Sequence, residues 1–305
     1  MKHLITLENY SEKEILDFIN LAQKIKKSPL KYKNKLNGKI LLMLFAKPSL
    51  RTHLSFDVAM YKLGGHAIFY DISNSPLGKK ESIKDGAKVM SKYVDVIMAR
   101  LYEHNDMVEF AKYSDVPIIS GLDNLEHPCQ VLGDLLTIKE KFGKLKGLKL
   151  VYLGDGNNNV THSLLYGCSK VGINMVISCP NRKEFLPNPI ILKKARKFAK
   201  KSKIEIISDP KIALKGADVL YTDTFMSYHI PESQKSRRLK FLMPYQVDNK
   251  LFNINKKALF MHCLPASRDV EVTDEVMDSK RSIVYDQAEN RIWIQMSILL
   301  KLLEK

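Results

Sequence analysis

The chain has 305 residues, 45% of them hydrophobic, and a formal net charge of +16 from 49 Lys and Arg against 33 Asp and Glu. This length favours two domains, and the apolar fraction is large enough for buried cores, which excludes a wholly disordered chain. No apolar run approaches the roughly 20 residues that span a bilayer, so a membrane protein is disfavoured. The N-terminal residues lack a signal peptide's apolar stretch, and the four cysteines form no CxxC pair. We therefore expect a cytoplasmic protein without disulfides or a zinc site.

The positive charge is carried mainly by lysine, since only nine of the basic residues are Arg. Two groups of lysines, at 24–35 and 193–203, alternate with apolar residues at helix-like spacing, which predicts solvated helix faces. A basic surface could instead bind nucleic acid, but no recognisable nucleic-acid module accompanies the charge, so that partner is disfavoured. Attraction of small anionic substrates is a third interpretation.

Strands and helices are predicted to alternate along the whole chain. In the first half we expect buried strands at 39–45, 67–71, 96–98 and 116–119, with helices at 52–63 and 128–141. In the second half we expect strands at 148–153, 175–178, 204–207, 219–222 and 259–261, with helices between them. Repeated β–α units with continuous apolar strands predict an α/β fold of parallel sheets covered by helices.

A Gly-containing stretch at 143–147 separates the two series of strands. We therefore expect two domains, residues 1–142 and 143–286, each a mainly parallel sheet with helices on both faces. The last helix, 287–305, is apolar on one side and is expected to pack back on the first domain. Ligands usually bind at the carboxyl ends of strands in such folds.

The stretch FAKPSLRTHLSF, at 45–56, brings two hydroxyls and an Arg to the predicted start of a helix. A helix N-terminus offers free N–H groups and a positive dipole end, and Arg51 would add a bidentate clamp, so this loop suits a phosphate. The alternative is an ordinary helix cap, Ser49 or Thr52, with Arg51 exposed. These residues alone do not decide between the two.

Two further motifs combine His, Cys and Pro. HPCQ, at 127–130, precedes an apolar helix, and a His and a Gln three residues apart can converge on a carbonyl and its amide. HCLP, at 262–265, follows a predicted strand and indicates a constrained turn that lines a cleft. The alternatives are a structural His in the first motif and a buried inert thiol in the second.

Polar loops follow two strands of the second half. GDGNNN, at 154–159, is not completed as a dinucleotide fingerprint, so its Asn residues are expected to bind a polar ligand or cap the next helix. Asp223 and Ser227 lie four residues apart in another loop and suit an ammonium and a carboxylate. The strongly polar segment 231–240 is a candidate lid.

The order and combination of these motifs resemble the aspartate/ornithine carbamoyltransferase family over essentially the whole chain. HCLP together with Asp-x-x-x-Ser looks like the ornithine branch. The resemblance rests on F-x-K-x-S-x-R-T, LG at 77–78 with ESIKD at 81–85, MAR at 98–100, HPCQ, the Asn run, Asp223 with Ser227, YQV at 245–247, HCLPA at 262–266 and AENR at 288–291.

The resemblance implies transfer of the carbamoyl group of carbamoyl phosphate to the side-chain amine of L-ornithine, giving L-citrulline and phosphate, with no metal and no organic cofactor. It also implies a homotrimer or a multiple of trimers. The implied catalytic residues are Arg51, Arg100, His127, Asp223 and Cys263. The implied carbamoyl-phosphate ligands are Ser49, Leu50, Arg51, Thr52, Arg100, His127, Gln130, Cys263, Leu264 and Arg291. The implied ornithine ligands are Asn159, Asp223, Ser227 and Tyr228.

The sequence departs from the family's pattern at a few positions. Leu50 and His53 stand where Thr and Arg are usual in the phosphate loop, and Pro76 stands where a Gln is usual. Tyr228 and His229 replace Met and Gly at the edge of the amino-acid pocket. Two alternatives follow: a carbamoyltransferase for another amine, such as putrescine, lysine or an acylated ornithine, or a non-catalytic homologue that binds a ligand or nucleic acid.

Overall fold

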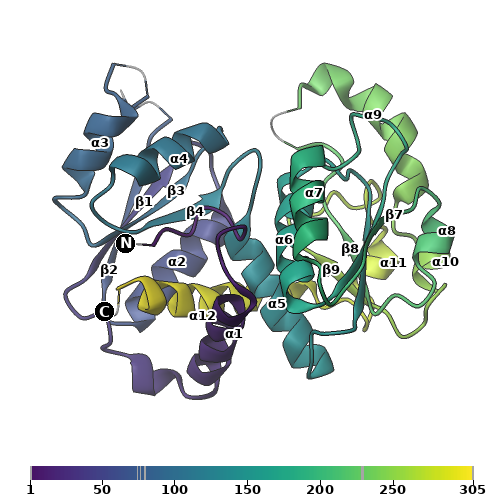
Figure 1. The fold of residues 1–305 in the computed structure, drawn as a ribbon, viewed down its shortest axis with the longest axis horizontal. Helices are drawn as coiled ribbons and strands as arrows, with labels where there is room; N and C mark the ends of the chain where they lie inside the picture. The colour runs from purple at the N-terminus through teal and green to yellow at the C-terminus, as the bar shows by residue number, and fades with distance from the viewer. Residues whose placement is uncertain (1, 74, 76, 79, 228–229, 304–305) are drawn as a thin grey trace. The chain divides into compact units, whose positions relative to one another are not determined.

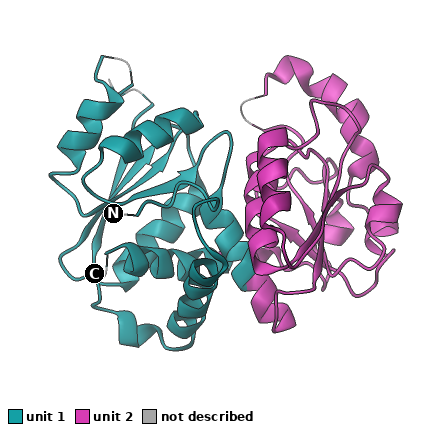
Figure 2. Ribbon diagram, in the orientation of Figure 1, with its two compact units in different colours: residues 1–136, 289–305 teal, residues 137–288 magenta. Residues whose placement is uncertain are grey.

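Two parallel β-sheets organise the chain, one in each of two compact units (Figure 2). The computed structural model describes residues 2–73, 75, 77–78, 80–227 and 230–303. The first unit contains residues 1–136 and 289–305, and the second contains residues 137–288. Helices α5 (Pro128–Phe142) and α12 (Val284–Leu303) carry the chain from one unit to the other. The predicted α/β architecture is confirmed, whereas the limits expected at 142 and 286 stay a prediction.

The first unit is built on a four-stranded sheet in which all neighbouring strands are parallel. Its helices are α1 (Glu12–Lys27), α2 (Leu50–Lys62), α3 (Ile83–Met90), α4 (His104–Tyr113), the start of α5 and most of α12, with a 3₁₀ turn η1 (Pro29–Tyr32). The strand order is β2 (His66–Asp71), β1 (Ile40–Phe45), β3 (Val96–Arg100), β4 (Ile118–Leu122). Helices α3 and α4 cover one face of this sheet, and α2 and α12 cover the other (Figure 1).

The second unit has a five-stranded parallel sheet. The strand order is β7 (Ile204–Ile206), β6 (Asn174–Ser178), β5 (Lys149–Leu153), β8 (Val219–Thr222), β9 (Leu259–His262). Helices α6 (Asn159–Val171) and α7 (Pro189–Phe198) pack side by side on one face of the sheet (Figure 1). The remaining short elements are α8 (Pro210–Ala213), η2 (Glu232–Gln234), α9 (Lys235–Leu242), η3 (Met243–Tyr245), α10 (Asn249–Phe252) and α11 (Asp274–Met277).

Each sheet has a point at which the chain changes direction across it. In the first unit this point lies between β1 and β3, because β2 pairs on the other side of β1. In the second unit it lies between β5 and β8 for the same reason. Right-handed crossovers place the connecting helices on opposite faces at such a point, which leaves a crevice beyond the carboxyl ends of the two strands.

Burial explains why most strands read as continuous apolar runs. Every residue of β4 and β8 is buried, as expected for parallel strands covered on both faces. Edge strand β2 is the exception, because five of its six residues are exposed and only Ala67 is partly buried. Its exposed side chains include Ile68, Phe69 and Tyr70, each 40–47% accessible.

Three expectations about local structure are wrong in detail. Strand β4 runs over Ile118–Leu122 rather than 116–119, because Pro117 has no N–H for the ladder. The lysines at 31–35 do not continue a helix face, since Pro29 begins a 3₁₀ turn after α1. The lysines at 200–203 likewise follow the end of α7 at Phe198.

No helix in the part of the chain that the structure describes is long and apolar enough to cross a membrane.

Candidate active site

The loop between β1 and α2 builds a phosphate-sized group of donors in the first unit. Ser49 is the N-cap of α2, and its side-chain oxygen accepts the N–H of Thr52 at 3.4 Å. Leu50 is the first helical residue and is 67% exposed, so its backbone N–H belongs to the open first turn. Capping therefore satisfies one of the free N–H groups and leaves the helix dipole aimed out of the N-terminus.

Arg51, Thr52 and Arg100 add side chains to this turn. Arg51 is half-buried and Thr52 is buried. Arg100 ends β3, where it pairs in register with Phe45 at the end of β1, and its Nη1 donates to Thr52 Oγ1 at 3.4 Å. A Cβ at Gly121 would lie 2.5 Å from Met98 Sδ and 3.4 Å from Thr52 Cγ2, so β4 needs a glycine beside this turn.

The start of α5 and the first-unit part of α12 meet beside the phosphate loop. Arg291 is buried, and its Nη1 donates to Gln130 Oε1 at 2.5 Å. Gln130 Nε2 donates to Asp134 Oδ1 at 2.8 Å, so both ends of this amide are held. Burial, followed by the charges of Arg291, Arg100 and Lys47, lowers the pKa of His127 well below its usual value. His127 is therefore a neutral imidazole at physiological pH.

The turn before His127 is fixed by a carboxylate cluster. Asp123 Oδ1 accepts the N–H groups of Leu125 and Glu126, and Asp123 Oδ2 lies 2.8 Å from His104 Nδ1. Burial raises the pKa of Glu126 to about 7. The pKa of His104 is raised by its contact with Asp123, against the effect of burial. These contacts hold the Asp123 carboxylate in place at the turn before His127.

In the second unit, the loops after β5, β8 and β9 converge on one carboxylate. Cys263 Sγ donates to Asp223 Oδ1 at 3.1 Å, and Asn158 Nδ2 lies 3.4 Å from Asp223 Oδ2. Asn158 also caps α6, since its Oδ1 accepts the N–H of Thr161 at 2.8 Å, and its Nδ2 donates to Tyr152 OH at 2.6 Å. Asp223 is thus a buried carboxylate held between a thiol and an amide.

The turn after β9 is held by a hydrogen bond between its backbone and a buried His. The N–H of Leu264 donates to His262 Nδ1 at 2.8 Å, and Leu264 has a φ of 59°. His262 therefore carries its proton on Nε2, which lies 3.4 Å from Glu271 Oε1. The Leu264 N–H is thus already used within the turn, which fixes the backbone next to Cys263.

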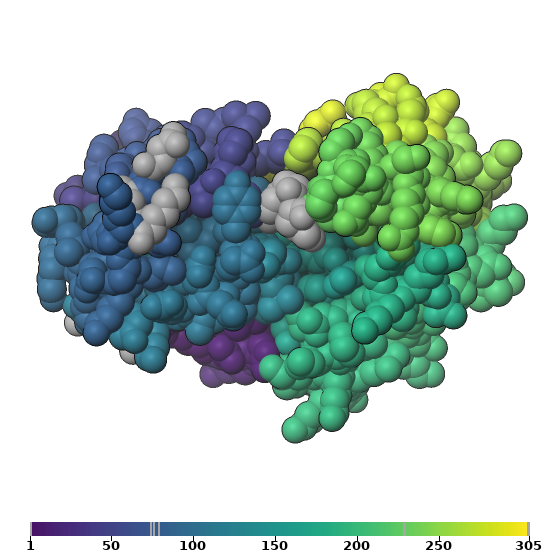
Figure 3. All heavy atoms as spheres, turned by 90° about the horizontal axis from the view of Figure 1, so that it is seen from above, coloured from purple at the N-terminus to yellow at the C-terminus, as the bar shows by residue number. Residues whose placement is uncertain are grey.

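The remaining predicted amino-acid ligands lie after strands β5 and β8. Asn159 begins α6, and Ser227 lies in the loop after β8; both are buried. The Phe225 carbonyl in that loop accepts a hydrogen bond from Arg238 Nε, and Arg238 also pairs with the buried Asp155. The candidate lid segment therefore includes α9, anchored by Arg238 while most of its residues form surface (Figure 3). Tyr228 lies outside the described residues.

Asp223, His262 and Cys263 are the one group of at least three possible metal ligands among the described residues, with ligand atoms within 4.8 Å of one another. Both nitrogens of His262 already face protein partners, Leu264 and Glu271. The Cys263 thiol and Asp223 are bonded to each other. This donor set does not fit a resident metal ion well.

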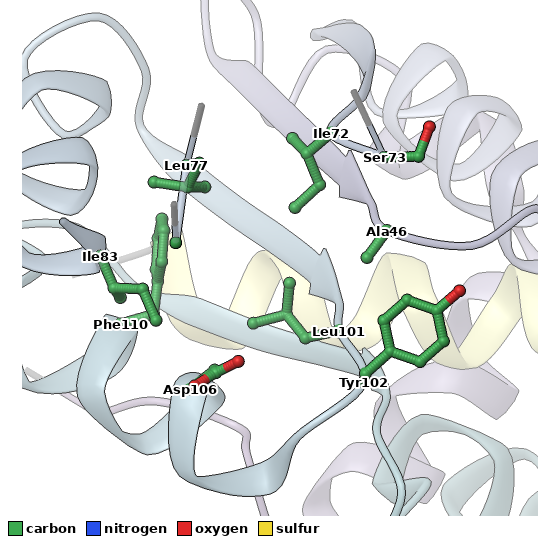
Figure 4. Close-up of a pocket in the computed structure, with 10 residues that line it drawn as sticks. Ala46, Ile72, Ser73, Leu77, Ile83, Leu101, Tyr102, Asp106 and Phe110 are labelled. Atoms are coloured by element: carbon green, nitrogen blue, oxygen red, sulfur yellow. The ribbon is translucent and has the colours of Figure 1, made fainter. Parts of the chain in front are cut away.

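A cavity of about 380 Å³ lies next to the phosphate loop of the first unit (Figure 4). Its lining includes Ala46, which follows β1, and Leu101 and Tyr102, which follow β3. It is mostly apolar, and Asp106 of α4 supplies a carboxylate (Figure 4). None of the predicted phosphate ligands is among the described residues that line it.

The structure gives a reason for one departure from the family's pattern. The His53 ring stacks on Phe69, with 4.3 Å between the centroids, and lies 5.8 Å from the ring of Phe45. A planar ring at this position thus joins an aromatic cluster. Nothing in the structure explains Leu50, and Pro76 and His229, like Tyr228, lie outside the described residues.

Sequence reasoning assigned no site role to Lys47 and Arg238, and it left Asn158 among the Asn residues that could bind a polar ligand or cap a helix. Lys47, Asn158 and Arg238 are all buried, and each contacts or acts on a predicted site residue or its loop. The signal for Asn158 was the run of three Asn, and the signal for Lys47 was its place in the F-x-K-x-S motif. Arg238 gave no local signal, because its partner Asp155 is 83 residues away.

Comparison with known proteins assigns the two units to one family. A family model of the aspartate/ornithine carbamoyltransferase carbamoyl-phosphate-binding domain matches residues 2–140, and the model of the Asp/Orn-binding domain matches residues 146–302. An ornithine carbamoyltransferase of Archaeoglobus fulgidus is 47% identical over all of this chain and 98% of its own length. One of Methanobrevibacter smithii is 49% identical over 95% of this chain and 96% of its own length.

A solved structure, ornithine carbamoyltransferase from Pyrococcus furiosus, is 43% identical and superposes with a TM-score of 0.94. The match covers 99% of this chain and 97% of that one. Two parallel-sheet units define a two-domain α/β protein, and its relatives identify it as a transferase. The chain belongs to the aspartate/ornithine carbamoyltransferase family.

Proposed function

We propose that this protein transfers the carbamoyl group of carbamoyl phosphate to the side-chain amine of L-ornithine, giving L-citrulline and phosphate. The observation that carries the proposal is the Asp223–Cys263 contact, which brings a carboxylate and a thiol together in the unit matched as the Asp/Orn-binding domain. The full-length relatives named ornithine carbamoyltransferase support ornithine as the amine.

The first unit would bind the phosphate end of carbamoyl phosphate. Ser49, Leu50 and Thr52 offer the first turn of α2, and Arg51 and Arg100 offer guanidinium groups. His127, as a neutral imidazole, would donate to the carbamoyl oxygen, where negative charge grows as the amine adds. Arg291 would act through Gln130, to which it is already bonded.

The second unit would bind ornithine and control the attacking nitrogen. Ornithine enters with a charged side-chain ammonium, which must lose one proton before the nitrogen can attack the carbamoyl carbon. That first proton passes to solvent. A new N–C bond then forms, the bond between the carbamoyl carbon and the bridging oxygen breaks, and its electron pair leaves with phosphate. The departing phosphate takes the second proton from the attacking nitrogen. Asp223 would hold the ammonium and orient the neutral amine, and the Leu264 carbonyl would accept from the carbamoyl amide.

The direct test is an amine panel assayed with carbamoyl phosphate. Ornithine, lysine, putrescine and N-acetylornithine would be compared by kcat/KM, with formation of the ureido product as the readout. The proposal expects ornithine to rank first by at least tenfold. No turnover with ornithine would refute the proposal. A higher kcat/KM for another amine would identify that amine as the substrate instead.

We also propose that the protein assembles as a homotrimer or a multiple of trimers. Support comes from edge strand β2, which exposes Ile68 and Tyr70 on one face, an apolar edge of the kind that a neighbouring subunit covers. Light scattering after gel filtration should give three, or a multiple of three, times the chain mass. A monomer mass at micromolar concentration would contradict the proposal.

A cytoplasmic location is proposed from the cysteines. All four are free thiols and three are buried, which suits a reducing compartment. Cell fractionation that recovers the activity with the membranes would contradict it.

A further inference from the structure

Lys47 is a buried lysine of the first unit. The resemblance to the family assigned it no role as a ligand. It lies in the short loop between β1 and α2, two residues before the N-cap Ser49, and is 6% exposed. Its Nζ lies 4.7 Å from the centroid of the Tyr102 ring. Tyr102 also lines the cavity beside Ala46 (Figure 4). Lys47 is therefore part of the phosphate loop, and its amine faces Tyr102, which follows the end of β3.

The charged groups around Lys47 oppose one another. Arg100, from the end of β3, disfavours the ammonium form, while Asp123 after β4 and Glu103 before α4 favour it. Lys47 in turn acts on His127 at the start of α5. The oxygens of Asp123 are already engaged by His104 and two backbone N–H groups, so this carboxylate compensates Lys47 only in part.

Burial and the charge of Arg100 together lower the pKa of Lys47 to about 7. In the absence of substrate, Lys47 is thus largely a neutral amine at pH 8. A phosphate monoester is already a dianion at that pH, and two added negative charges next to a buried amine favour its charged form.

We propose that binding of carbamoyl phosphate is coupled to the uptake of one proton from solvent by the side-chain amine of Lys47, which becomes the ammonium of the phosphate-binding group. The proton adds to the Nζ lone pair and no other bond changes. This inference rests on the proposed function, because it requires that the first unit binds carbamoyl phosphate. Under this proposal Lys47 becomes charged only when the substrate binds, whereas Arg51 and Arg100 are charged at all times.

Proton uptake is measured by calorimetry of carbamoyl phosphate binding, without an amine, in two buffers of different ionisation enthalpy. At pH 8 we expect about 0.9 proton taken up per site, falling below about 0.3 at pH 6.5, where Lys47 is already mostly charged. The dissociation constant should rise about tenfold per pH unit above pH 7.5. Uptake near zero at pH 8 in the unmodified protein would overturn the proposal without requiring any variant.

Two variants identify the group. Lys47→Arg keeps a permanent charge and should bind with uptake below about 0.2 and little dependence on pH. Lys47→Met is suited to a buried site, should also show no uptake, and should bind at least about tenfold more weakly at pH 7. Lys112→Arg, at an exposed position of α4, is the matched control and should behave like the unmodified protein.

Glu126 is the rival proton acceptor, because its pKa of about 7 falls in the same range. Glu126→Gln should leave uptake at pH 8 unchanged if Lys47 takes the proton. Uptake that persists in both Lys47 variants but disappears in Glu126→Gln would overturn the proposal. Citrulline formation measured on the same preparations distinguishes a failure of the Lys47 proposal from a failure of the proposed function. Normal turnover without proton uptake refutes only the role of Lys47, whereas no binding of carbamoyl phosphate refutes the proposed function as well.

Discussion

The two sheets place their candidate site residues at equivalent points but supply opposite chemistry. In the first unit, the loop after β1 and the end of β3 flank the switch point, and both contribute cations, Arg51 and Arg100. In the second unit, the loops after β5 and β8 flank it, and they contribute an amide and a carboxylate, Asn158 and Asp223. The position of each site thus follows from strand order, whereas the charge of each site follows from a few side chains.

The two sites also differ in the charged side chain that the protein itself engages near each of them. In the first unit, the carboxylate of Asp123 is engaged by His104 and by backbone N–H groups. In the second unit, the cation Arg238 is paired with Asp155, which leaves Asp223 to a substrate's ammonium. Each unit neutralises the charge that would compete with its proposed substrate.

The largest expected effect comes from removing the first unit's clamp. Arg51→Ala should lower kcat/KM for carbamoyl phosphate by about 10³-fold, because the guanidinium stabilises charge that grows in the transition state. Unfolding temperature should change little, since Arg51 is only half-buried. Steady-state citrulline formation and a thermal melt check both points. Arg237→Ala, at an exposed arginine of α9, is the control; a loss below about tenfold for Arg51→Ala would remove it from the catalytic set.

The corresponding change in the second unit should affect the other substrate. Asp223→Asn should lower kcat/KM for ornithine by about 10²-fold, because a neutral amide cannot pair with the ammonium. The KM for carbamoyl phosphate should stay within about threefold of its starting value if the two units divide the substrates as proposed. Initial rates at varied ornithine and varied carbamoyl phosphate give the two numbers. Asp57→Asn, an exposed carboxylate of α2, should change neither. Equal losses for both substrates would contradict the division.

The sequence predicted the alternation of strands and helices well, because buried parallel strands such as β3 and β8 are unbroken apolar runs. It also located most candidate ligands, since the polar groups that follow strands β1, β5, β8 and β9 are local in the chain. Contacts between distant segments were not readable from those local patterns. The bond from Arg291 to Gln130 and the pair of Arg238 with Asp155 span 161 and 83 residues.

Partial burial was equally hidden from the sequence. The apolar run of β2 resembles that of a buried strand, yet five of its six residues are exposed at the edge of the sheet. Lys47 showed the opposite error, since lysine is expected at the surface and this one is almost fully buried. The sequence shows how many charged residues the chain has. The pKa of each group also depends on neighbours that only the folded chain brings close to it.

A smaller effect tests the carboxylate cluster beneath His127. Burial raises the pKa of Glu126 from 4.5 to about 7, so the folded protein binds more protons than the unfolded chain between these values. Stability should therefore fall as pH rises from about 4.5 to 7, by roughly 3 kcal/mol for this one group. Glu126→Gln should reduce that fall, so its advantage in unfolding free energy should be larger at pH 8 than at pH 5. Urea unfolding at both values measures the difference, and an equal effect at both would show that Glu126 is ionised normally.

The smallest expected effect separates a helix cap from a substrate contact in the second unit. Asn158→Ala removes the cap of α6, which costs about 1–2 kcal/mol, and also removes the amide beside Asp223. Asn188→Ala removes the equivalent cap of α7, where the side chain accepts from Ile190 and Ile191, and provides a matched control. Both variants should lower the unfolding temperature by a few degrees, but only Asn158→Ala should lower kcat/KM for ornithine, by about tenfold. If the two variants lose equal stability and Asn158→Ala keeps full activity, Asn158 only caps its helix. The orientation of Asp223 would then depend on Cys263, which Cys263→Ala would test by the same ornithine titration.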